Sequence, residues 1–172
     1  SARHMKTVDE LLEEPSLLTA ESLEIVDECG NCVLHEAVST WDPCLWKIPI
    51  ELLTAENLLR KNDSGQNVLH LAARNGTLHQ VPAAILGEEN LQVMDDSGDN
   101  VLHCAATNGT LHHLPQELLV EKLLLACNKN QATVLHVASF NGCLWQVPSE
   151  YLSEENLLLK ESDGDSVAHN VA

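Results

Sequence analysis

Five histidines recur at nearly constant spacing, and they are the side chains of this sequence best suited to chemistry. His35, His70, His103, His136 and His169 are separated by 35, 33, 33 and 33 residues. Imidazoles bind metal ions and transfer protons near neutral pH. Each of these histidines, however, closes a similar Val-(Leu/Ala)-His triplet, and one imidazole per unit at the same position is what a structural hydrogen bond predicts. We therefore predict no metal site, no catalytic residue and no enzyme activity.

Cys29 and Cys32 form a C-x-x-C pair, a spacing at which two thiolates can hold zinc. The sequence has no second C-x-x-C and no paired histidines nearby to complete such a site. The alternative, which we favour, is that the two cysteines occupy turn positions filled elsewhere by Ser64 and Asn67. The remaining cysteines suggest no disulfide framework, so we expect reduced thiols and no cofactor; they are Cys44, Cys104, Cys127 and Cys143.

The composition limits the classes of partner. The 172 residues are 44% hydrophobic but only 3% aromatic, which suits a long core of thin stacked helices. Nine basic and 26 acidic residues give a net charge of -17, so we expect no binding to nucleic acid or anionic membranes. With neither a long apolar run nor a signal peptide, we expect a soluble cytoplasmic protein. Residues 1–4, ahead of Met5, resemble a cloning remnant.

A period of 33 residues is typical of a stacked solenoid, and the unit can be read from its second copy. Leu69, Ala72 and Ala73 have the i, i+3, i+4 spacing of a helix with one buried face. Asn75-Gly76 then ends that helix, since glycine adopts the left-handed conformation without strain. Leu78 and Val81 are expected to pack the following turn.

The second half of the unit predicts two further short helices and a projecting turn. Pro82 stands where the first of them should begin, at a position that needs no N–H, and the helix should end at Ile85-Leu86. A third, very short helix follows from sequences such as Thr54-Ala-Glu-Asn-Leu-Leu, which begin with a capping hydroxyl. Asp63-Ser64-Gly65 is typical of a tight turn, so each unit should project a finger, and the fingers should line one edge.

The third copy, Asp95-x-x-Gly98-x-Asn100-Val101-Leu102-His103-x-Ala105-Ala106-x-Asn108-Gly109-x-Leu111, resembles the ankyrin repeat. The resemblance recurs from about Asp27 to the end, and it implies an all-α solenoid in which the histidine braces the turn and the neighbouring repeat. Ankyrin units usually carry Thr-Pro before Leu-His, whereas this chain has Asn-Val or Thr-Val there and places proline before the outer helix. This sequence pattern resembles a variant that is associated with bacterial ankyrin proteins, some of which are secreted into host cells.

On this basis residues 5–172 are expected to form one ankyrin repeat domain. It consists of an N-terminal cap, four repeats and a partial fifth repeat: residues 6–26, about 27–61, 62–94, 95–127, 128–160 and 161–172. The sequence of the cap is similar to the outer half of a unit, so the cap should cover the first repeat. The last segment begins an inner helix without its outer partner, and an uncovered solenoid end exposes apolar surface. We therefore expect the natural polypeptide to continue, or another molecule to cover this end.

One column of large side chains remains open to two interpretations. Trp46, His79, His112 and Trp145 occupy equivalent positions in four successive units. They form either a half-exposed ladder or packing beneath the outer helices, and we favour packing.

Ankyrin proteins usually contact partners through their finger tips and the exposed side of their inner helices. Two aromatic residues stand out on this surface: Trp41, inside a two-residue insertion, and Phe140, where other units have Arg74 and Thr107. They are expected to anchor a partner, although each could instead fold back to fill a local gap. The remaining predicted contacts are Asp63, Ser64, Gln66, Arg74 and Asn75 in the second unit; Asp96, Ser97, Asp99, Thr107 and Asn108 in the third; and Lys129, Asn130 and Asn141 in the fourth.

Three functions are compatible with these features. The resemblance favours a non-catalytic module that presents an acidic concave face to a basic or polar protein partner. The alternative is homodimerisation through the repeat surface or the C-terminal edge of the stack. The third, an enzyme that uses the cysteines and histidines, is the least favoured, and no small-molecule substrate is expected.

Overall fold

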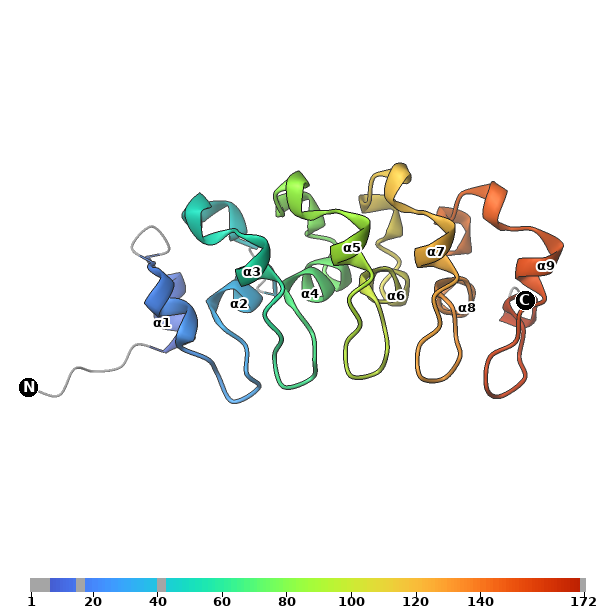
Figure 1. The fold of residues 1–172 in the computed structure, drawn as a ribbon, viewed down its shortest axis with the longest axis horizontal. Coiled ribbons are helices and arrows are strands. Elements are labelled where there is room, and N and C mark those ends of the chain that lie inside the picture. Colours follow the sequence, from blue (N-terminus) through green and yellow to red (C-terminus); the bar gives the residue numbers. More distant parts are fainter. Residues whose placement is uncertain (1–6, 15–17, 40–42, 171–172) are drawn as a thin grey trace, which may run out of the picture.

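Four seven-residue helices form the inner layer of a row of stacked units. The computed structural model describes residues 7–14, 18–39 and 43–170. Each inner helix packs against the next one along the chain (Figure 1). In three of them the N-cap side chain, Asn67, Asn100 or Thr133, accepts a hydrogen bond from the backbone N–H of the histidine three residues later. The inner helices are α2 (Val33–Ser39), α4 (Val68–Arg74), α6 (Val101–Thr107) and α8 (Val134–Phe140).

The outer layer is built of single turns rather than one longer helix. Each unit has two successive 3-10 turns and then a four-residue α-helix. The first turns are η3 (Leu45–Lys47), η5 (Leu78–Gln80), η7 (Leu111–His113) and η9 (Leu144–Gln146). The second turns are η4 (Ile50–Leu52), η6 (Ala83–Ile85), η8 (Gln116–Leu118) and η10 (Ser149–Tyr151). The α-helices are α3 (Ala55–Leu58), α5 (Glu88–Leu91), α7 (Glu121–Leu124) and α9 (Glu154–Leu157).

The expected position of the proline is therefore wrong by one residue. Pro82 precedes the first helical residue of η6 and has a ψ of 129°, outside the helical region. Its carbonyl still accepts a hydrogen bond from the N–H of Ile85 at 2.9 Å, which closes the single turn. The segment that was expected only as a turn, around Leu78, is itself a 3-10 turn, and Leu78 and Val81 are buried as predicted.

Fingers project from the same side of every unit (Figure 1). In the second finger the side-chain oxygen of Asn62 accepts hydrogen bonds from the N–H groups of Ser64 and Gln66, both at 3.0 Å. Gly65 adopts a φ of 70° at the tip. The N–H of Asp96 donates to the carbonyl of Ser64 at 3.1 Å, so adjacent fingers are also joined through the main chain. Within the described residues the fingers contain isolated bridges and no continuous strand.

The fourth finger departs from this pattern, because Gln131 occupies the place of the glycine with a φ of 59°. A side chain in this conformation costs about 1–2 kcal/mol, more than the extra backbone entropy of glycine. We expect Gln131→Gly to raise the free energy of unfolding by about 0.5–1 kcal/mol, measured by urea denaturation. Asn130→Gly, at a neighbour with no positive φ, serves as the control and should destabilise the protein. Equal effects of the two substitutions would contradict this explanation.

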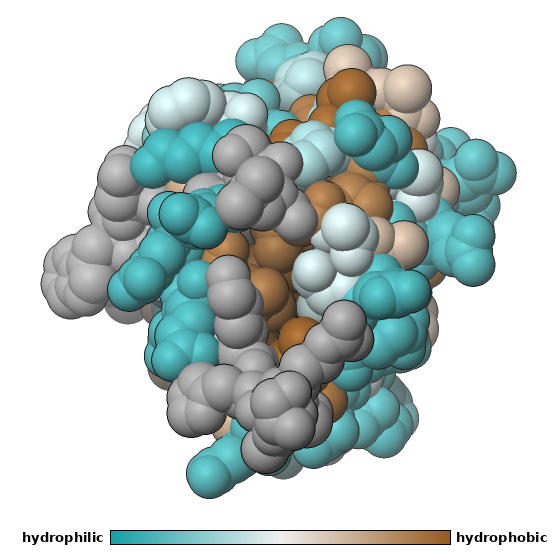
Figure 2. All heavy atoms as spheres, turned by 90° about the vertical axis from the view of Figure 1, so that its left-hand side faces the viewer, coloured by the Kyte–Doolittle hydropathy of each residue, from teal (hydrophilic) through white to brown (hydrophobic). Residues whose placement is uncertain are grey.

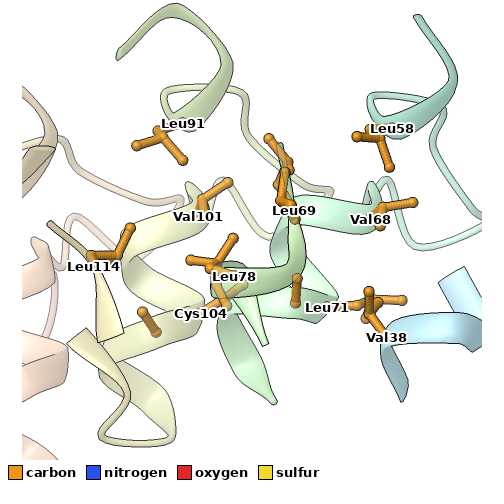
Figure 3. Packing of buried hydrophobic residues seen from close by; sticks show 14 of the residues in the cluster. Val38, Leu58, Val68, Leu69, Leu71, Leu78, Leu91, Val101, Cys104 and Leu114 are labelled. Carbon is orange, nitrogen blue, oxygen red and sulfur yellow. The ribbon is translucent and has the colours of Figure 1, made fainter. Parts of the chain in front are cut away.

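One continuous apolar core runs through the stack. Leu58, Leu69 and Leu91 point into the space between the layers, and Leu78 and Leu114 fill the turn beyond the inner helices (Figure 3). Seen from the N-terminal end, hydrophobic residues gather in the middle and hydrophilic residues surround them (Figure 2). Burial of one such leucine contributes about 1.5–3 kcal/mol, so the stability of each unit depends on the contacts with its neighbours.

Side chains from each unit also bond to main-chain atoms of the unit before it. Gln146 donates to the carbonyl of Gly109 at 2.8 Å and accepts from the N–H of His112 at 3.1 Å. Gln80 makes the equivalent pair of bonds with Pro43 and Leu45. These bonds fix the spacing of the turns that follow the inner helices.

The N-terminal segment holds more than the outer half of a unit that was expected. Helix α1 (Val8–Leu12) packs against α2, in the position of an inner helix, and buries Val8 and Leu11. The 3-10 turn η2 (Ala20–Glu24) follows and buries Leu23. The i, i+3 spacing of Val8 and Leu11 carried this signal in the sequence. Residues 1–6, including the proposed cloning remnant, lie outside the described residues.

At the other end, a 3-10 turn η11 (Val167–Asn170) packs against α8. Val167 is buried there, and its carbonyl accepts a hydrogen bond from the hydroxyl of Ser139 at 2.7 Å. In the part of the chain that the structure describes, no helix has the length and apolar character needed to cross a membrane.

Candidate functional site

The repeated histidines hold neighbouring units together. In His103 the Nδ1 atom lies 3.2 Å from the backbone nitrogen of Asn100, and the Nε2 atom lies 3.1 Å from the carbonyl of Ala132 in the next unit. His70 contacts the carbonyl of Asp99 at 3.2 Å in the same way. His35 and His136 repeat this arrangement. Both nitrogens of each ring therefore have partners within the protein, as the structural interpretation predicted.

Burial changes the acidity of these rings. It lowers the pKa of His35, His70 and His103, although the hydrogen bonds to carbonyl groups act in the opposite direction. These histidines are consequently neutral at physiological pH. Among the described residues, no group of three or more potential ligands is arranged to hold a metal ion.

The cysteines occupy structural positions. Cys32 is buried at the start of α2, with its sulfur 3.2 Å from Nδ1 of His35, whereas Cys29 is exposed in the finger. Burial raises the pKa of Cys104 to about 12 and also raises the pKa of Cys143, whose thiol donates to the carbonyl of Ala106. A thiol with a raised pKa is a poor nucleophile. The environments of these two cysteines do not favour nucleophilic chemistry.

Most of the predicted finger contacts are exposed, but Gln66 is not. Its exposed fraction is only 9%, because its side-chain amide donates to the carboxylate of Asp95 in the next finger at 3.2 Å. Gln66 is therefore not part of the exposed finger surface, and its contact with a partner stays a prediction. Asp99, the equivalent residue in the third finger, is half-buried and accepts from Asn128 at 2.8 Å. The exposed finger residues are Asp63, Ser64, Asp96, Ser97, Lys129 and Asn130.

The ends of the inner helices supply the second part of the candidate face. Phe140 at the end of α8 is 76% exposed, so it does not fold back to fill a gap. Trp41 lies outside the described residues. Asn75 is exposed, yet its amide also donates to the carbonyl of Val38 at 3.2 Å. The other exposed residues predicted here are Arg74, Thr107, Asn108 and Asn141.

Two cavities show that fingers and inner helices meet on one face. The first, about 670 Å³, lies between α1, the first finger and α2, and the carboxylates of Asp9, Asp27, Glu28 and Glu36 line it. Burial and the neighbouring charges of Asp27 and Asp9 raise the pKa of Glu36. The second cavity, about 250 Å³, lies between the fourth finger and α8, beside Phe140. An approaching cation would relieve the repulsion in the first cavity.

The column of large side chains does not pack beneath the outer turns, so the favoured interpretation is wrong. Trp46 is 68% exposed and Trp145 is 75% exposed, and His79 and His112 are exposed as well. The rings of His112 and Trp145 stack with their centroids 6.3 Å apart. Leu45, Leu78 and Leu111, each next to one of these residues, fill the core instead.

Sequence reasoning missed three residues of this face. Glu36 stands where other units have Leu71, Cys104 and Val137, and Glu161 and Ala132 line the second cavity. An alignment of the units could have identified these three residues, because each of them differs in size or charge from its equivalents in the other units. The prediction selected only columns known as contacts in the family, and Glu36 lies outside them.

Stacked units of finger, inner helix and short outer helices define the ankyrin-repeat class. Residues 69–149 match the family described as ankyrin repeats (3 copies), and the chain is an ankyrin repeat protein. Ankyrin repeats generally mediate protein–protein interaction.

Comparison with solved structures supports the same fold. One similar chain, with 21% sequence identity and a TM-score of 0.69, belongs to the structure of the predatory endopeptidase Bd0816 from Bdellovibrio bacteriovorus in complex with immunity protein Bd3460. The likeness covers 98% of this chain and 92% of that chain. A search of curated proteins gave no match.

Proposed function

We propose that this protein is a non-catalytic binding module that holds a basic partner protein on the face formed by its fingers and inner helices. The observation that carries this proposal is the contrast between buried and exposed positions when equivalent residues of the repeats are compared. The buried leucines and histidines repeat from unit to unit, whereas the exposed column at the end of the inner helices changes from Arg74 to Thr107 to Phe140. Packing requires the first set to be similar, whereas the second set is exposed to solvent, where larger differences are tolerated.

The sign of the partner's charge follows from the carboxylates. The net charge is -17, and four carboxylates line the cavity beside α1. Complementary charge accelerates association and is screened by salt. A partner surface rich in lysine or arginine fits this face. The complex of an endopeptidase with an immunity protein is an example of a chain of this fold in a protein complex.

Phe140 provides the test of this face. We expect Phe140→Ala to weaken the captured partner's binding at least tenfold, about 1.4 kcal/mol, because an exposed aromatic anchor loses its contact area. Trp145→Ala is the matched control, since Trp145 is equally exposed in the same repeat but does not line the cavity. Partners would be isolated by affinity capture and their binding measured by calorimetry. Loss of binding in Trp145→Ala, with Phe140→Ala unchanged, would assign binding to the other side of the protein.

Homodimerisation is supported by one observation at the C-terminal edge. Leu157 is half-buried, although its equivalents Leu58, Leu91 and Leu124 are fully buried. The adjacent Leu158 is 59% exposed, whereas its equivalents Leu59 and Leu125 are half-buried. Exposed leucines at the end of a stack can pair with a second copy. The mass in solution, measured across a hundredfold dilution, separates the two functions, since a monomer at every concentration contradicts the dimer.

A further inference from the structure

Side-chain hydrogen bonds join successive fingers in the first three units. In each case a polar side chain near the end of one finger bonds to the first residue of the next. The pairs are Asn31 with Asn62 at 2.8 Å, Gln66 with Asp95 at 3.2 Å, and Asp99 with Asn128 at 2.8 Å. These contacts fill the space between neighbouring fingers.

The fourth finger lacks this bond because Ala132 stands where the other units have a longer polar side chain. A methyl group cannot reach Glu161, the first residue of the fifth finger. The two fingers remain joined through the main chain, where the N–H of Ser162 donates to the carbonyl of Asn130 at 2.9 Å. The space left by the missing side chain is part of the 250 Å³ cavity, which Ala132, Glu161 and Phe140 line. It has room for about eight water molecules or one long side chain.

Glu161 differs from its equivalents in a second way. In each of the other fingers the first residue is aspartate or asparagine, and its side-chain oxygen accepts a hydrogen bond from the N–H two residues later. Glutamate is longer by one methylene group, and within the described residues its carboxylate has no hydrogen bond or ion pair. The charge of Glu161 is therefore available to a ligand in the cavity.

The remaining walls of the cavity are apolar or amide groups, together with the ring of His136, whose nitrogens contact the hydroxyl of Thr133 at 2.9 Å and the carbonyl of Leu159 at 2.8 Å. Val137 and Ala132 form an apolar wall, the exposed ring of Phe140 stands at one side, and Asn130 carries an amide. A suitable ligand has an aliphatic stem, a flat positively charged head and several hydrogen-bond donors. Arginine combines these features, because its stem covers apolar surface while its guanidinium stacks on aromatic rings and bonds carboxylates in pairs.

We propose that this cavity receives an arginine side chain of the partner protein, with the guanidinium between the carboxylate of Glu161 and the ring of Phe140. This inference rests on the proposed function, because it names the group that the binding face recognises. Lysine fits less well, since its compact ammonium is more strongly hydrated and bonds the carboxylate at a single point. An uncharged apolar side chain would leave the carboxylate without a partner.

The test uses Nα-acetyl-arginine amide and an NMR titration of the labelled chain. We expect saturable shifts of the methyl signals of Ala132 and Val137. Nα-acetyl-citrulline amide, which has nearly the same shape without the charge, should bind at least fivefold more weakly. Glu161→Gln should weaken arginine binding at least fivefold while keeping the size of the side chain.

Ala132→Gln is the matched variant, because it restores the residue found at Gln66 and gives Glu161 a hydrogen-bond partner. We expect it to fill the cavity, abolish the arginine shifts and leave the midpoint of thermal unfolding unchanged or higher. Equal binding of acetyl-leucine amide, or undiminished arginine binding in Glu161→Gln, would overturn the proposal. If a partner depends on Phe140 but the arginine amide produces no shifts, the arginine cavity fails while the protein-binding function stands.

Discussion

Gly65→Ala is expected to lower the free energy of unfolding by about 3 kcal/mol, the sum of backbone strain and overpacking. Gly65 has a φ of 70°, which a side chain rarely adopts. A methyl carbon there would lie 2.8 Å from the backbone nitrogen of Asp96. That nitrogen cannot move freely, because its N–H donates to the carbonyl of Ser64. Urea denaturation followed by circular dichroism measures the loss.

Gly164→Ala separates the two causes. Gly164 occupies the same position in the fifth finger with a φ of 89°, but a methyl carbon there meets nothing within 4 Å. Only the strain should remain, about 1–2 kcal/mol. If both variants lose the same free energy, close packing between fingers makes no contribution to stability.

Acidification below pH 6.5 is expected to destabilise the protein with a slope of up to about 4 kcal/mol per pH unit. Burial lowers the pKa of His35, His70 and His103 in the folded protein, so the unfolded chain takes up protons first as the pH falls through 6.5. Each histidine contributes about 1.4 kcal/mol per pH unit between its unfolded and folded pKa values. Stability is thus highest above pH 6.5 and is lost below it.

Urea denaturation at intervals from pH 7.5 to 5.5 measures this slope and avoids most carboxyl titration, which lies near pH 4. His103→Gln removes one of the three groups, so its slope should be smaller by about a third. Its stability at pH 7.5 will be lower as well, since the bond to the carbonyl of Ala132 is lost. An unchanged slope in this variant would show that other groups control the acid sensitivity.

The fold could be predicted because buried columns repeat. Leu69, His70 and Ala72 recur in register with the glycines that end most of the inner helices and fingers, and packing leaves little freedom at such positions. The outer layer was harder to predict from the sequence, since turns of three or four residues give no periodic hydrophobic pattern. A proline identifies the region of a turn there without fixing its first residue, as Pro82 shows.

The site was less predictable, because exposure depends on neighbours that lie about 30 residues away. Gln66 is buried only because Asp95 of the next finger accepts its hydrogen bond. Trp145 is exposed because the adjacent Leu144 points inward and takes part in the core. The bond between Gln66 and Asp95 spans two units, and the sequence of one unit does not indicate which of the adjacent Leu144 and Trp145 points inward. Comparing unlike residues across units, such as Ala132 with Gln66, is the approach that would have found the second cavity.

The acceptors at the joints between units are largely backbone carbonyls. Gln146 bonds to Gly109, His113 bonds to Gly76 at 2.8 Å, and the ring of His70 bonds to Asp99, in each case through a group that every amino acid possesses. The hydrogen bond itself requires no particular side chain on the accepting residue, although Gly76 must be glycine because a methyl carbon there would lie 2.7 Å from the ring of His113. When gene duplication or recombination adds, removes or exchanges a whole unit, these main-chain bonds can form again with the new neighbour, whereas the side-chain pairs between fingers, such as Gln66 with Asp95, must be matched.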